Sequence, residues 1–450
     1  MNSKLINAFM PNHIIIENKI NSFNKKIKVS SDKSISIRCI LLASQAVGIS
    51  KISNLLESED VINALKTIKK LGINYKKDRN VYNIHGFGLN GFNIKRNTVI
   101  NAGNSGTLAR LILGLLIKSK SKIKLIGDKS LSKRDFSRVI KPLRLFGANI
   151  RSKKKNLPIE ILGSDFLRPI TYNEEIGSAQ VKSCIMFGAL NTPGKTIINA
   201  KSSRNHTELM LKFLKYPIKV KKDKKYDRIL IDGQRQFKCF EYNVPGDISS
   251  ASFFIVLTLL SENSKINIEN VNVNRSRVGV ISILNKMGAN IKLKKKRIYN
   301  GEEIADIHVK SIKNLRSINC PSELNSSAID EFLIIFLVAA KAKGISRFEE
   351  LEEMNKKESK RLNLAIKFLK SIGIRVERFD NDINIHGNPN LKLSGKFEVK
   401  NFLKDHRIFF LSCIAALTLG GIWKINDKQS ANTSFPKFLK TCKFLGAKIS

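Results

Sequence analysis

The segment LNKMGANI (residues 284–291) has the pattern of a helix end, a glycine and the start of a strand. The pattern occurs four more times, as IKKLGINY (68–75), LRLFGANI (143–150), LKSIGIRV (369–376) and CKFLGAKI (442–449). A glycine suits the position after a helix because the chain must take a positive φ there before it enters a strand. A sixth, degenerate copy, LKYPIKV (214–220), places Pro217 where the glycine would stand. Because the six anchors lie about 70 to 85 residues apart, the sequence predicts a sixfold repeat.

A second helix is predicted earlier in each repeat. The six segments begin with small or charged residues and continue as apolar runs, and they start near Lys33, Ser105, Ser178, Ser249, Asp330 and Asp405. A helix that is apolar on most faces is expected to be buried, with only its first turn free to meet solvent or a ligand. Short β-branched runs such as KIKLIG and RILIDG alternate with the helices. Each repeat therefore predicts a β-α-β-α-β-β unit, and the whole chain an α/β protein of two domains with three repeats each.

Composition narrows the class of protein. The chain has 450 residues, 42% of them hydrophobic, which is enough for sizeable cores and favours two domains. The N-terminal stretch does not resemble a signal peptide, and the weakly polar residues 408–423 fall short of a membrane span, so we expect a cytoplasmic protein. The six cysteines show no C-x-x-C pair and no metal-like grouping with histidine, so we expect neither a disulfide nor a metal site.

The formal net charge of +43 leaves two interpretations open. Lysines are spread along the whole chain together with many Asn and Ile residues, a pattern typical of an AT-rich genome. The basic clusters at 153–155, 219–225 and 292–297 look like turns between strands and carry no aromatic platform for stacking bases. We expect no nucleic-acid partner, and a basic repeat protein that binds nucleic acid without catalysis stays the alternative.

The predicted helix starts offer a function for the repeat. Free N–H groups and the helix dipole favour anions at a helix N-terminus, and these starts also carry cationic side chains. Taken singly, each Ser, Asp or Asn is better explained as an ordinary N-cap. Six such starts around a common cleft would suit a phosphorylated or carboxylated ligand.

Nine segments in order resemble the 5-enolpyruvylshikimate-3-phosphate synthases, from about Val29 to the C-terminus. They are DKSISIR (32–38), GNSGT (103–107) with Arg110, GDKSLSKR (127–134), SAQVKS (178–183), SSRNHTE (202–208), VPGDISSA (244–251), IDE (329–331), KES-x-R (357–361) and DHRI (405–408). The resemblance implies the enolpyruvyl transferase fold, a two-domain inverse α/β barrel whose domains close on the substrates. Three repeat anchors precede residue 243 and three follow it, which predicts domains at residues 31–242 and at residues 1–30 plus 243–450, with the active site between them.

The resemblance also implies a set of binding residues. Shikimate 3-phosphate would be bound by Lys33, Ser34, Arg38, Ser178, Ala179, Arg204 and Asp330. Phosphoenolpyruvate would be bound by Lys33, Asn104, Gly106, Arg134, Gln180, Arg361 and Arg407. Guanidinium groups suit these ligands because they bind phosphate and carboxylate oxygens bidentately. Ser34 and Arg38 stand four residues apart, so one helix face presents both.

The implied chemistry is transfer of the enolpyruvyl group from phosphoenolpyruvate to the 5-hydroxyl of shikimate 3-phosphate. Asp330 would abstract the hydroxyl proton, and Glu358 would exchange a proton with the methylene carbon, assisted by Lys33. No cofactor is implied, and the family expectation is a monomer. Singly, Asp330 could be an N-cap and Glu358 with Arg361 an ordinary helix pair. Their joint occurrence at family positions favours the catalytic interpretation.

Departures from the family pattern lie at Asp135, Asn355, Lys360 and Thr433, around the predicted phosphoenolpyruvate site. The herbicide glyphosate occupies that site in the family, and tolerant members carry Ala where this chain has Gly106. The nearest alternative function is the sister enolpyruvyl transfer to UDP-N-acetylglucosamine. Members of that sister group carry Lys-Asn at the first helix, whereas this chain has Lys33 and Ser34.

Overall fold

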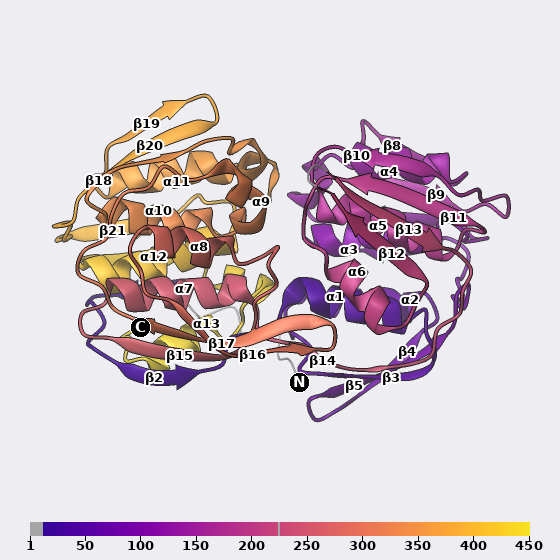
Figure 1. Cartoon of the computed structure of the whole chain (residues 1–450), viewed down its shortest axis with the longest axis horizontal. Helices are drawn as coiled ribbons and strands as arrows, with labels where there is room; N and C mark the ends of the chain where they lie inside the picture. The colour runs from indigo at the N-terminus through magenta and orange to yellow at the C-terminus, as the bar shows by residue number, and fades with distance from the viewer. Residues whose placement is uncertain (1–11, 224–225) are drawn as a thin grey trace.

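The structure is a computed structural model that describes residues 12–223 and 226–450. Figure 1 shows two lobes side by side. The N-lobe has a hydrophobic core that runs from Ile35 to Val244. The core of the C-lobe joins residues 14–29 to residues 248–447. Residues 1–11 of the predicted second domain lie outside the described residues.

The described part of the N-lobe contains six helices and twelve strands. The helices are α1 (Lys33–Ala43), α2 (Glu59–Lys70), α3 (Gly106–Leu115), α4 (Ser137–Leu145), α5 (Ala179–Leu190) and α6 (His206–Phe213). The strands are β3 (Val47–Ser53), β4 (Asn74–Asp78), β5 (Val81–Phe87), β6 (Thr98–Asn101), β7 (Ile123–Ile126), β8 (Asn149–Lys153), β9 (Asn156–Leu162), β10 (Thr171–Glu174), β11 (Lys195–Ala200), β12 (Ile218–Lys222), β13 (Asp227–Asp232) and β14 (Glu241–Asn243).

The described part of the C-lobe repeats this plan with one extra short helix. Its helices are α7 (Ile248–Leu260), α8 (Gly279–Lys286), α9 (Asn325–Ala328), α10 (Phe332–Lys341), α11 (Arg361–Ser371), α12 (His406–Leu419) and α13 (Phe438–Phe444). Its strands are β1 (His13–Ile16), β2 (Asn24–Ile27), β15 (Lys265–Asn272), β16 (Lys292–Tyr299), β17 (Glu302–Lys310), β18 (Gly344–Phe348), β19 (Val376–Phe379), β20 (Asp382–Gly387), β21 (Lys396–Val399) and β22 (Ile422–Asn426).

Within the described ranges the strands form six sheets, one for each predicted repeat. The second repeat shows the unit clearly: β6 and β7 are parallel, α3 connects them, and the hairpin β8–β9 completes the sheet in the order β6-β7-β9-β8. The predicted β-α-β-α-β-β pattern is thus confirmed.

Two sheets take their first strand from elsewhere in the chain. The sheet of the first repeat begins with β14, which runs parallel to β3. The sheet of the fourth repeat uses β2, which runs parallel to β15. The sheet of the sixth repeat is completed by β1, which pairs antiparallel with β22. The N-terminal segment therefore adds strands to the C-lobe, and the chain crosses between the lobes twice.

The two crossings lie against each other in an antiparallel arrangement. Ser31 and Gly246 form an isolated bridge. The Asp32 N–H donates to the carbonyl oxygen of Pro245 at 2.8 Å, and the Asp247 N–H donates to that of Ser30 at 2.9 Å. The only covalent connections between the described parts of the lobes thus share one place in the molecule.

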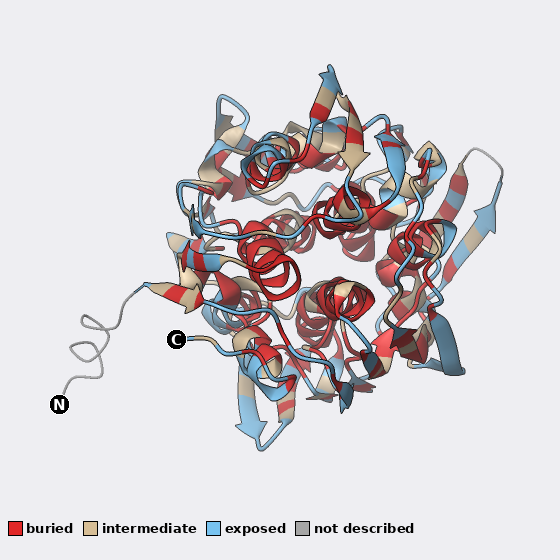
Figure 2. Cartoon of the chain, turned by 90° about the vertical axis from the view of Figure 1, so that its left-hand side faces the viewer, coloured by how far each residue is buried: buried red, intermediate tan, exposed pale blue. Residues whose placement is uncertain are grey.

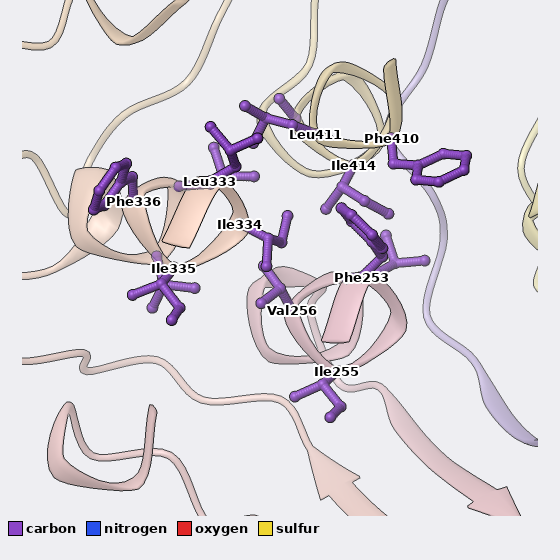
Figure 3. Close-up of a cluster of buried hydrophobic side chains, with 14 of the residues drawn as sticks. Phe253, Ile255, Val256, Leu333, Ile334, Ile335, Phe336, Phe410, Leu411 and Ile414 are labelled. Carbon is purple, nitrogen blue, oxygen red and sulfur yellow. The ribbon is translucent and has the colours of Figure 1, made fainter. Parts of the chain in front are cut away.

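The first helix of each repeat is buried, as its apolar sequence predicts. Figure 2 looks onto the C-lobe and shows buried helices at the centre, with strands of mixed burial around them. In Figure 3, side chains of α7, α10 and α12 meet in one cluster, among them Val256, Ile334 and Ile414. Burying such a side chain stabilises the fold by about 1.5–3 kcal/mol. Helices inside and sheets outside make each lobe an inverse α/β barrel.

Five of the six predicted helix starts agree with the structure within one residue, and the fifth lies two residues before its helix. Asp330 lies in a turn between α9 and α10, and α10 begins at Phe332. Asp330 is therefore not an N-cap, and its side chain is available for other contacts. No helix within the described ranges is long and apolar enough to span a membrane.

The helix endings confirm the glycine pattern at all five glycines and correct the sixth copy. Gly72, Gly147, Gly288, Gly373 and Gly446 each follow a helix with φ between +80° and +107°. In α6 the equivalent residue is Lys215, with a φ of +56°, and not Pro217 as the sequence predicts. The hydrogen bond from the Tyr216 N–H to the Leu211 carbonyl repeats the one from Ile73 to Ile68, which fixes this register.

Candidate active site

A cluster of charged side chains lies where the two lobes meet. The N-lobe contributes residues at the starts of α1, α3, α5 and α6 and the loop after β7. The C-lobe contributes the turn before α10 and the starts of α11 and α12. These elements place charged and polar groups at helix N-termini because their apolar bodies are buried in the lobe cores.

Asp330 is the centre of this cluster. Its carboxylate accepts a hydrogen bond from Arg204 of the N-lobe at 2.6 Å and another from Arg361 at 3.3 Å, and it lies 3.5 Å from Lys357 Nζ. Arg407 donates to its backbone oxygen at 2.7 Å. Burial alone would raise the pKa of Asp330, but Lys357, Arg204 and the other cations outweigh burial and hold the pKa well below its usual range. The carboxylate is therefore ionised at neutral pH.

Glu358 lies on the other side of Arg361. It pairs with Arg361 Nη2 at 2.5 Å and lies 3.7 Å from Arg134 Nη1 of the N-lobe. The Ser130 hydroxyl, also from the N-lobe, donates to the Glu358 backbone oxygen at 2.9 Å. Burial would raise the pKa of Glu358, but Arg361 and Arg134 outweigh it and hold the pKa well below its usual range. Both predicted catalytic carboxylates thus share one arginine.

Lys33 approaches the same cluster from α1. Its Nζ lies 2.8 Å from Asp60 Oδ2, a carboxylate of α2. Burial acts to lower the pKa of Lys33, but Asp60 and Glu358 outweigh it and raise the pKa. The ammonium group therefore stays charged and is able to pair with an anion.

The predicted pair on α1 does share a face. Arg38 donates to the Ser34 backbone oxygen at 2.9 Å, to Thr207 Oγ1 at 2.8 Å and to Ser183 Oγ at 3.0 Å. Arg38 is only 3% exposed, so α1, α5 and α6 fix its guanidinium in place.

Four of the predicted phosphoenolpyruvate residues lie on the N-lobe side: Asn104, Gly106, Arg134 and Gln180. Arg134 donates to Asn104 Oδ1 at 2.7 Å. Gly106 is the first residue of α3, and a methyl group added there would lie 2.8 Å from Arg134 Nη1. Gln180 Oε1 accepts a hydrogen bond from Arg110 at 2.6 Å. A small residue at Gly106 is therefore what lets Arg134 approach the start of the helix.

The start of α5 holds Ser178 and Ala179. The Ser178 hydroxyl caps the helix by accepting a hydrogen bond from the Val181 N–H, and Ala179 is its first residue. The Glu174 carboxylate accepts hydrogen bonds from the N–H groups of Gly177 and Ser178 at 2.8 and 3.0 Å. Glu174 thus holds the backbone before this helix in place.

Sequence reasoning left four site residues without a role: Asp60, Arg110, Lys357 and Asp405. Lys357, Arg110 and Asp405 stand inside or beside motifs that resemble the family, and this was a usable signal. Asp60 pairs with Lys33, and Asp405 with Arg361, across sequence distances that no local pattern reveals.

Two of the departures from the family pattern have structural roles. The Asp135 carboxylate accepts a hydrogen bond from the Ser137 N–H at 2.6 Å, at the start of α4. The Asn355 side chain accepts one from the Leu362 N–H at 3.2 Å, in the first turn of α11. Both residues stabilise the first turn of a helix close to Arg134 or Arg361.

Comparison with known proteins agrees with this geometry. A family model described as EPSP synthase (3-phosphoshikimate 1-carboxyvinyltransferase) matches residues 17–442. A 3-phosphoshikimate 1-carboxyvinyltransferase from Ruthia magnifica subsp. Calyptogena magnifica is 40% identical over 431 residues, which is 96% of this chain and 97% of the relative. The enzyme of the same name from Legionella pneumophila (strain Philadelphia 1) is 36% identical over 436 residues, 96% of this chain and 98% of its own length.

Solved structures show the same likeness. EPSP synthase from Acinetobacter baumannii superposes with a TM-score of 0.85 at 34% identity, covering 97% of this chain and 99% of that one. The enolpyruvyl transferase NikO from Streptomyces tendae has a TM-score of 0.76 at 13% identity over 98% and 99% of the two chains, and shares the fold. With a matching family model over nearly the whole length, and relatives at 36–40% identity, the chain belongs to the EPSP synthase family.

Proposed function

We propose that the chain is a transferase of the shikimate pathway, which leads to chorismate and the aromatic amino acids. It transfers the enolpyruvyl group of phosphoenolpyruvate to the 5-hydroxyl of shikimate 3-phosphate and releases phosphate. The observation that carries this conclusion is its membership of the EPSP synthase family over nearly its full length. Enolpyruvyl transfer to UDP-N-acetylglucosamine is disfavoured for the same reason.

The site residues are assigned as the family pattern implies. Shikimate 3-phosphate is bound by Lys33, Ser34, Arg38, Ser178, Ala179, Arg204 and Asp330, and phosphoenolpyruvate by Lys33, Asn104, Gly106, Arg134, Gln180, Arg361 and Arg407. The contacts of Asp330 with Arg204 and Arg361 support this assignment, because they bring cations from both lobes to one carboxylate. Lys357 joins the site through its approach to Asp330.

In the proposed mechanism Asp330 accepts the proton of the 5-hydroxyl of shikimate 3-phosphate. The oxygen of that hydroxyl attacks C2 of phosphoenolpyruvate at the same time. Glu358, assisted by Lys33, delivers a proton to C3, so that a tetrahedral adduct forms. Glu358 then takes a proton back from C3 while the C2–O bond to phosphate breaks, so that phosphate leaves and the C2–C3 double bond of the enol ether product forms. General acid and base groups of this kind contribute about 10² to 10⁴ in rate.

The pairing of Glu358 explains how an ionised carboxylate becomes an acid. Arg361 and Arg134 depress its pKa, and both are assigned to phosphoenolpyruvate. An anionic substrate competes for these guanidinium groups, so the pKa of Glu358 rises when the substrate binds. Protonation of Glu358 is then coupled to occupation of the site.

The proposed function also involves movement of two domains. Two domains, residues 31–242 and residues 1–30 plus 243–450, close on the substrates about the paired crossings at Ser31 and Gly246, and the two separate hydrophobic cores support this division. The protein acts as a cytoplasmic monomer on small-molecule substrates and binds no nucleic acid. The mixed charges around Asp330 and Glu358 favour a small anionic substrate over a nucleic-acid backbone, which calls for cations alone.

A phosphate-release assay tests the function directly. Release is expected only when phosphoenolpyruvate and shikimate 3-phosphate are both present, and UDP-N-acetylglucosamine is expected not to replace the second substrate. Asp330→Asn, which keeps the size of the side chain, is expected to lower kcat by at least about 10². Equal release with UDP-N-acetylglucosamine would favour the sister reaction. Salt-sensitive retention of a DNA duplex on filters, without phosphate release, would favour the nucleic-acid alternative.

A further inference from the structure

Arg277 lies in the loop between β15 and α8, directly beside the two crossings. Its side chain is only 2% exposed. One amino group, Nη1, donates to Asp32 Oδ2 at 3.1 Å. The other, Nη2, donates to Asp247 Oδ1 at 3.0 Å and to Ser249 Oγ at 2.8 Å. A single buried guanidinium thus contacts both crossings at once.

Both carboxylates that Arg277 contacts are helix N-caps. Asp32 caps α1 by accepting a hydrogen bond from the Ile35 N–H at 2.8 Å, and α1 begins with Lys33 in the N-lobe. Asp247 caps α7 of the C-lobe through the Ser249 N–H, also at 2.8 Å. The planar fork of Arg277 therefore fixes the start of one buried helix relative to the start of another.

The contacts extend from Arg277 to the turn that holds Asp330. Ser249 accepts a hydrogen bond from Arg277 and donates its own hydroxyl hydrogen to Glu331 Oε1. Glu331 is 1% exposed, follows Asp330 directly and precedes α10. A continuous path of buried hydrogen bonds therefore connects the start of α1 with the turn at Asp330.

Arg277 also approaches the start of α6. Its Nη1 lies 3.4 Å from His206 Nε2, and His206 Nδ1 lies 2.6 Å from Glu302 of the C-lobe. His206 follows Arg204 by two residues, and Arg204 is paired with Asp330. Contacts of His206 with Arg277 and Glu302 thus also hold the segment that bears Arg204.

The geometry points to Arg277 as a positioning residue that holds Lys33 of the N-lobe and Asp330 of the C-lobe in one catalytic alignment. The inference rests on the proposed function, which assigns Lys33 and Asp330 to the substrates. Arg277 acts through the N-caps and through Glu331. Lysine could keep the positive charge but cannot reproduce the fork that spans Asp32 and Asp247, so the proposal depends on shape as well as charge.

The test first establishes that the wild type releases phosphate when both substrates are present. Arg277→Lys is then compared with the wild type. Turnover is expressed per folded molecule, with the folded fraction taken from circular dichroism at the assay temperature. We expect kcat to fall by at least about tenfold and both KM values to change by less than about threefold, because misplacement of a catalytic group acts mainly on the transition state. The matched control is Arg275→Lys, two residues away and 85% exposed, with an unchanged kcat expected.

A purely structural role for Arg277 predicts a different result. The folded fraction would fall, but kcat per folded molecule would stay within twofold of the wild type, and this would overturn the proposal. If Arg277→Lys does not fold, Ser249→Ala carries the test, since it interrupts the path to Glu331 and leaves both ion pairs of Arg277 in place. A loss of about threefold or more in kcat supports the proposal, and an unchanged kcat in Ser249→Ala overturns it. A wild type without phosphate release would instead refute the proposed function.

Discussion

Arg134 is the residue whose contribution to phosphoenolpyruvate binding can be measured most cleanly. Its contacts are the Asn104 side chain and a distant approach to Glu358, so its removal leaves few buried groups without a partner. A hydrogen bond to a charged group contributes about 1.5–3 kcal/mol, so Arg134→Ala is expected to raise the KM for phosphoenolpyruvate at least about tenfold. Steady-state kinetics with the exposed neighbour variant Lys133→Ala provide the control.

Arg361→Ala is expected to cause the same loss of affinity together with a loss of stability. Arg361 is 2% exposed and pairs with Asp405, Glu358 and Asp330. Its removal leaves these carboxylates near one another without a common cation, which costs about 3–5 kcal/mol of unfolding free energy. Urea unfolding separates this effect from the kinetic one. An unchanged KM in both Arg134→Ala and Arg361→Ala would contradict the binding role.

Gly106 controls how much room exists beside Arg134. A methyl group there would lie 2.8 Å from Arg134 Nη1 and 3.1 Å from Arg110 Nη1, so the two guanidinium groups must shift. Glyphosate is longer than phosphoenolpyruvate and is crowded more by such a shift. We expect competitive inhibition of the wild type, and Gly106→Ala should raise the inhibition constant by a larger factor than the KM. Equal factors, or a wild type that glyphosate does not inhibit, would show that Gly106 does not control access.

His406 makes stability depend on pH. Burial lowers the pKa of His406 to about 3, and Lys33 acts in the same direction. In the unfolded chain the pKa is about 6.5, so between these values the unfolded state binds more protons than the folded state. Stability is therefore lost as pH falls from about 6.5, by up to about 1.4 kcal/mol per pH unit.

Urea unfolding at pH 5 and pH 7 measures this dependence. His406→Asn is expected to reduce the difference in unfolding free energy between the two pH values. His85→Asn, at an exposed histidine, is the control and should leave the difference unchanged. An identical difference in the wild type and in His406→Asn would exclude His406 as its source.

At the scale of elements, the ending of α6 carries strain that the other five endings avoid. Lys215 takes the left-handed conformation that glycine takes after the corresponding helices. A side chain in this conformation costs about 1–2 kcal/mol, of which the greater freedom of glycine in the unfolded chain offsets about 0.5–1 kcal/mol. Lys215→Gly is therefore expected to raise the unfolding free energy by up to about 1 kcal/mol.

Gly446→Ala is the matched control for Lys215→Gly. No atom lies within 4 Å of the position of its added methyl group, so any destabilisation comes from the backbone alone. We expect a loss of about 1 kcal/mol in urea unfolding. A stabilised Gly446→Ala variant, or a destabilised Lys215→Gly variant, would show that φ does not determine the stability of these endings.

The elements also show which parts of the fold a sequence can predict. Helix endings and buried helices are local patterns, so their number and order could be predicted from the repeat. The predicted domain limits place β2 in the second domain, but local patterns do not show which strands β2 and β14 pair with, because each joins a sheet whose other strands are distant in sequence. Pro217 was assigned wrongly because a proline is a recognisable signal of a helix end, whereas a lysine with positive φ leaves no signal in the sequence.

At the scale of the whole molecule, the candidate site depends on pairs that join the lobes. Arg204 and Asp330 lie 126 residues apart, and Arg138 pairs with Glu353 across 215 residues. Motifs predicted that Arg204 and Asp330 belong to one site, but only because both resemble a known family. Arg277 itself lies outside those motifs, although its partners Asp32 and Asp247 lie inside them. No local pattern predicts that Arg277 pairs with both.

The two lobes are expected to close when both substrates bind. Arg204–Asp330 and Arg134–Glu358 join the lobes and involve residues that are assigned to the substrates, whereas Arg138–Glu353 joins them without such an assignment. The chain has a net charge of +43, so cations of the two lobes repel one another when no anionic ligand is bound. Phosphoenolpyruvate and shikimate 3-phosphate supply the anions, and the paired crossings leave a single hinge for the movement.

Small-angle scattering measures this movement directly. We expect the radius of gyration to fall when both ligands are added, and to fall less with either ligand alone. Inorganic phosphate at equal ionic strength is the control, because general screening acts over about 8 Å at 0.15 M salt and would compact the protein without occupying the whole site. If phosphate produces the same change, compaction reflects screening alone. If both substrates together leave the radius of gyration unchanged, the lobes do not close on them, and the hinge at Ser31 and Gly246 has no part in the reaction.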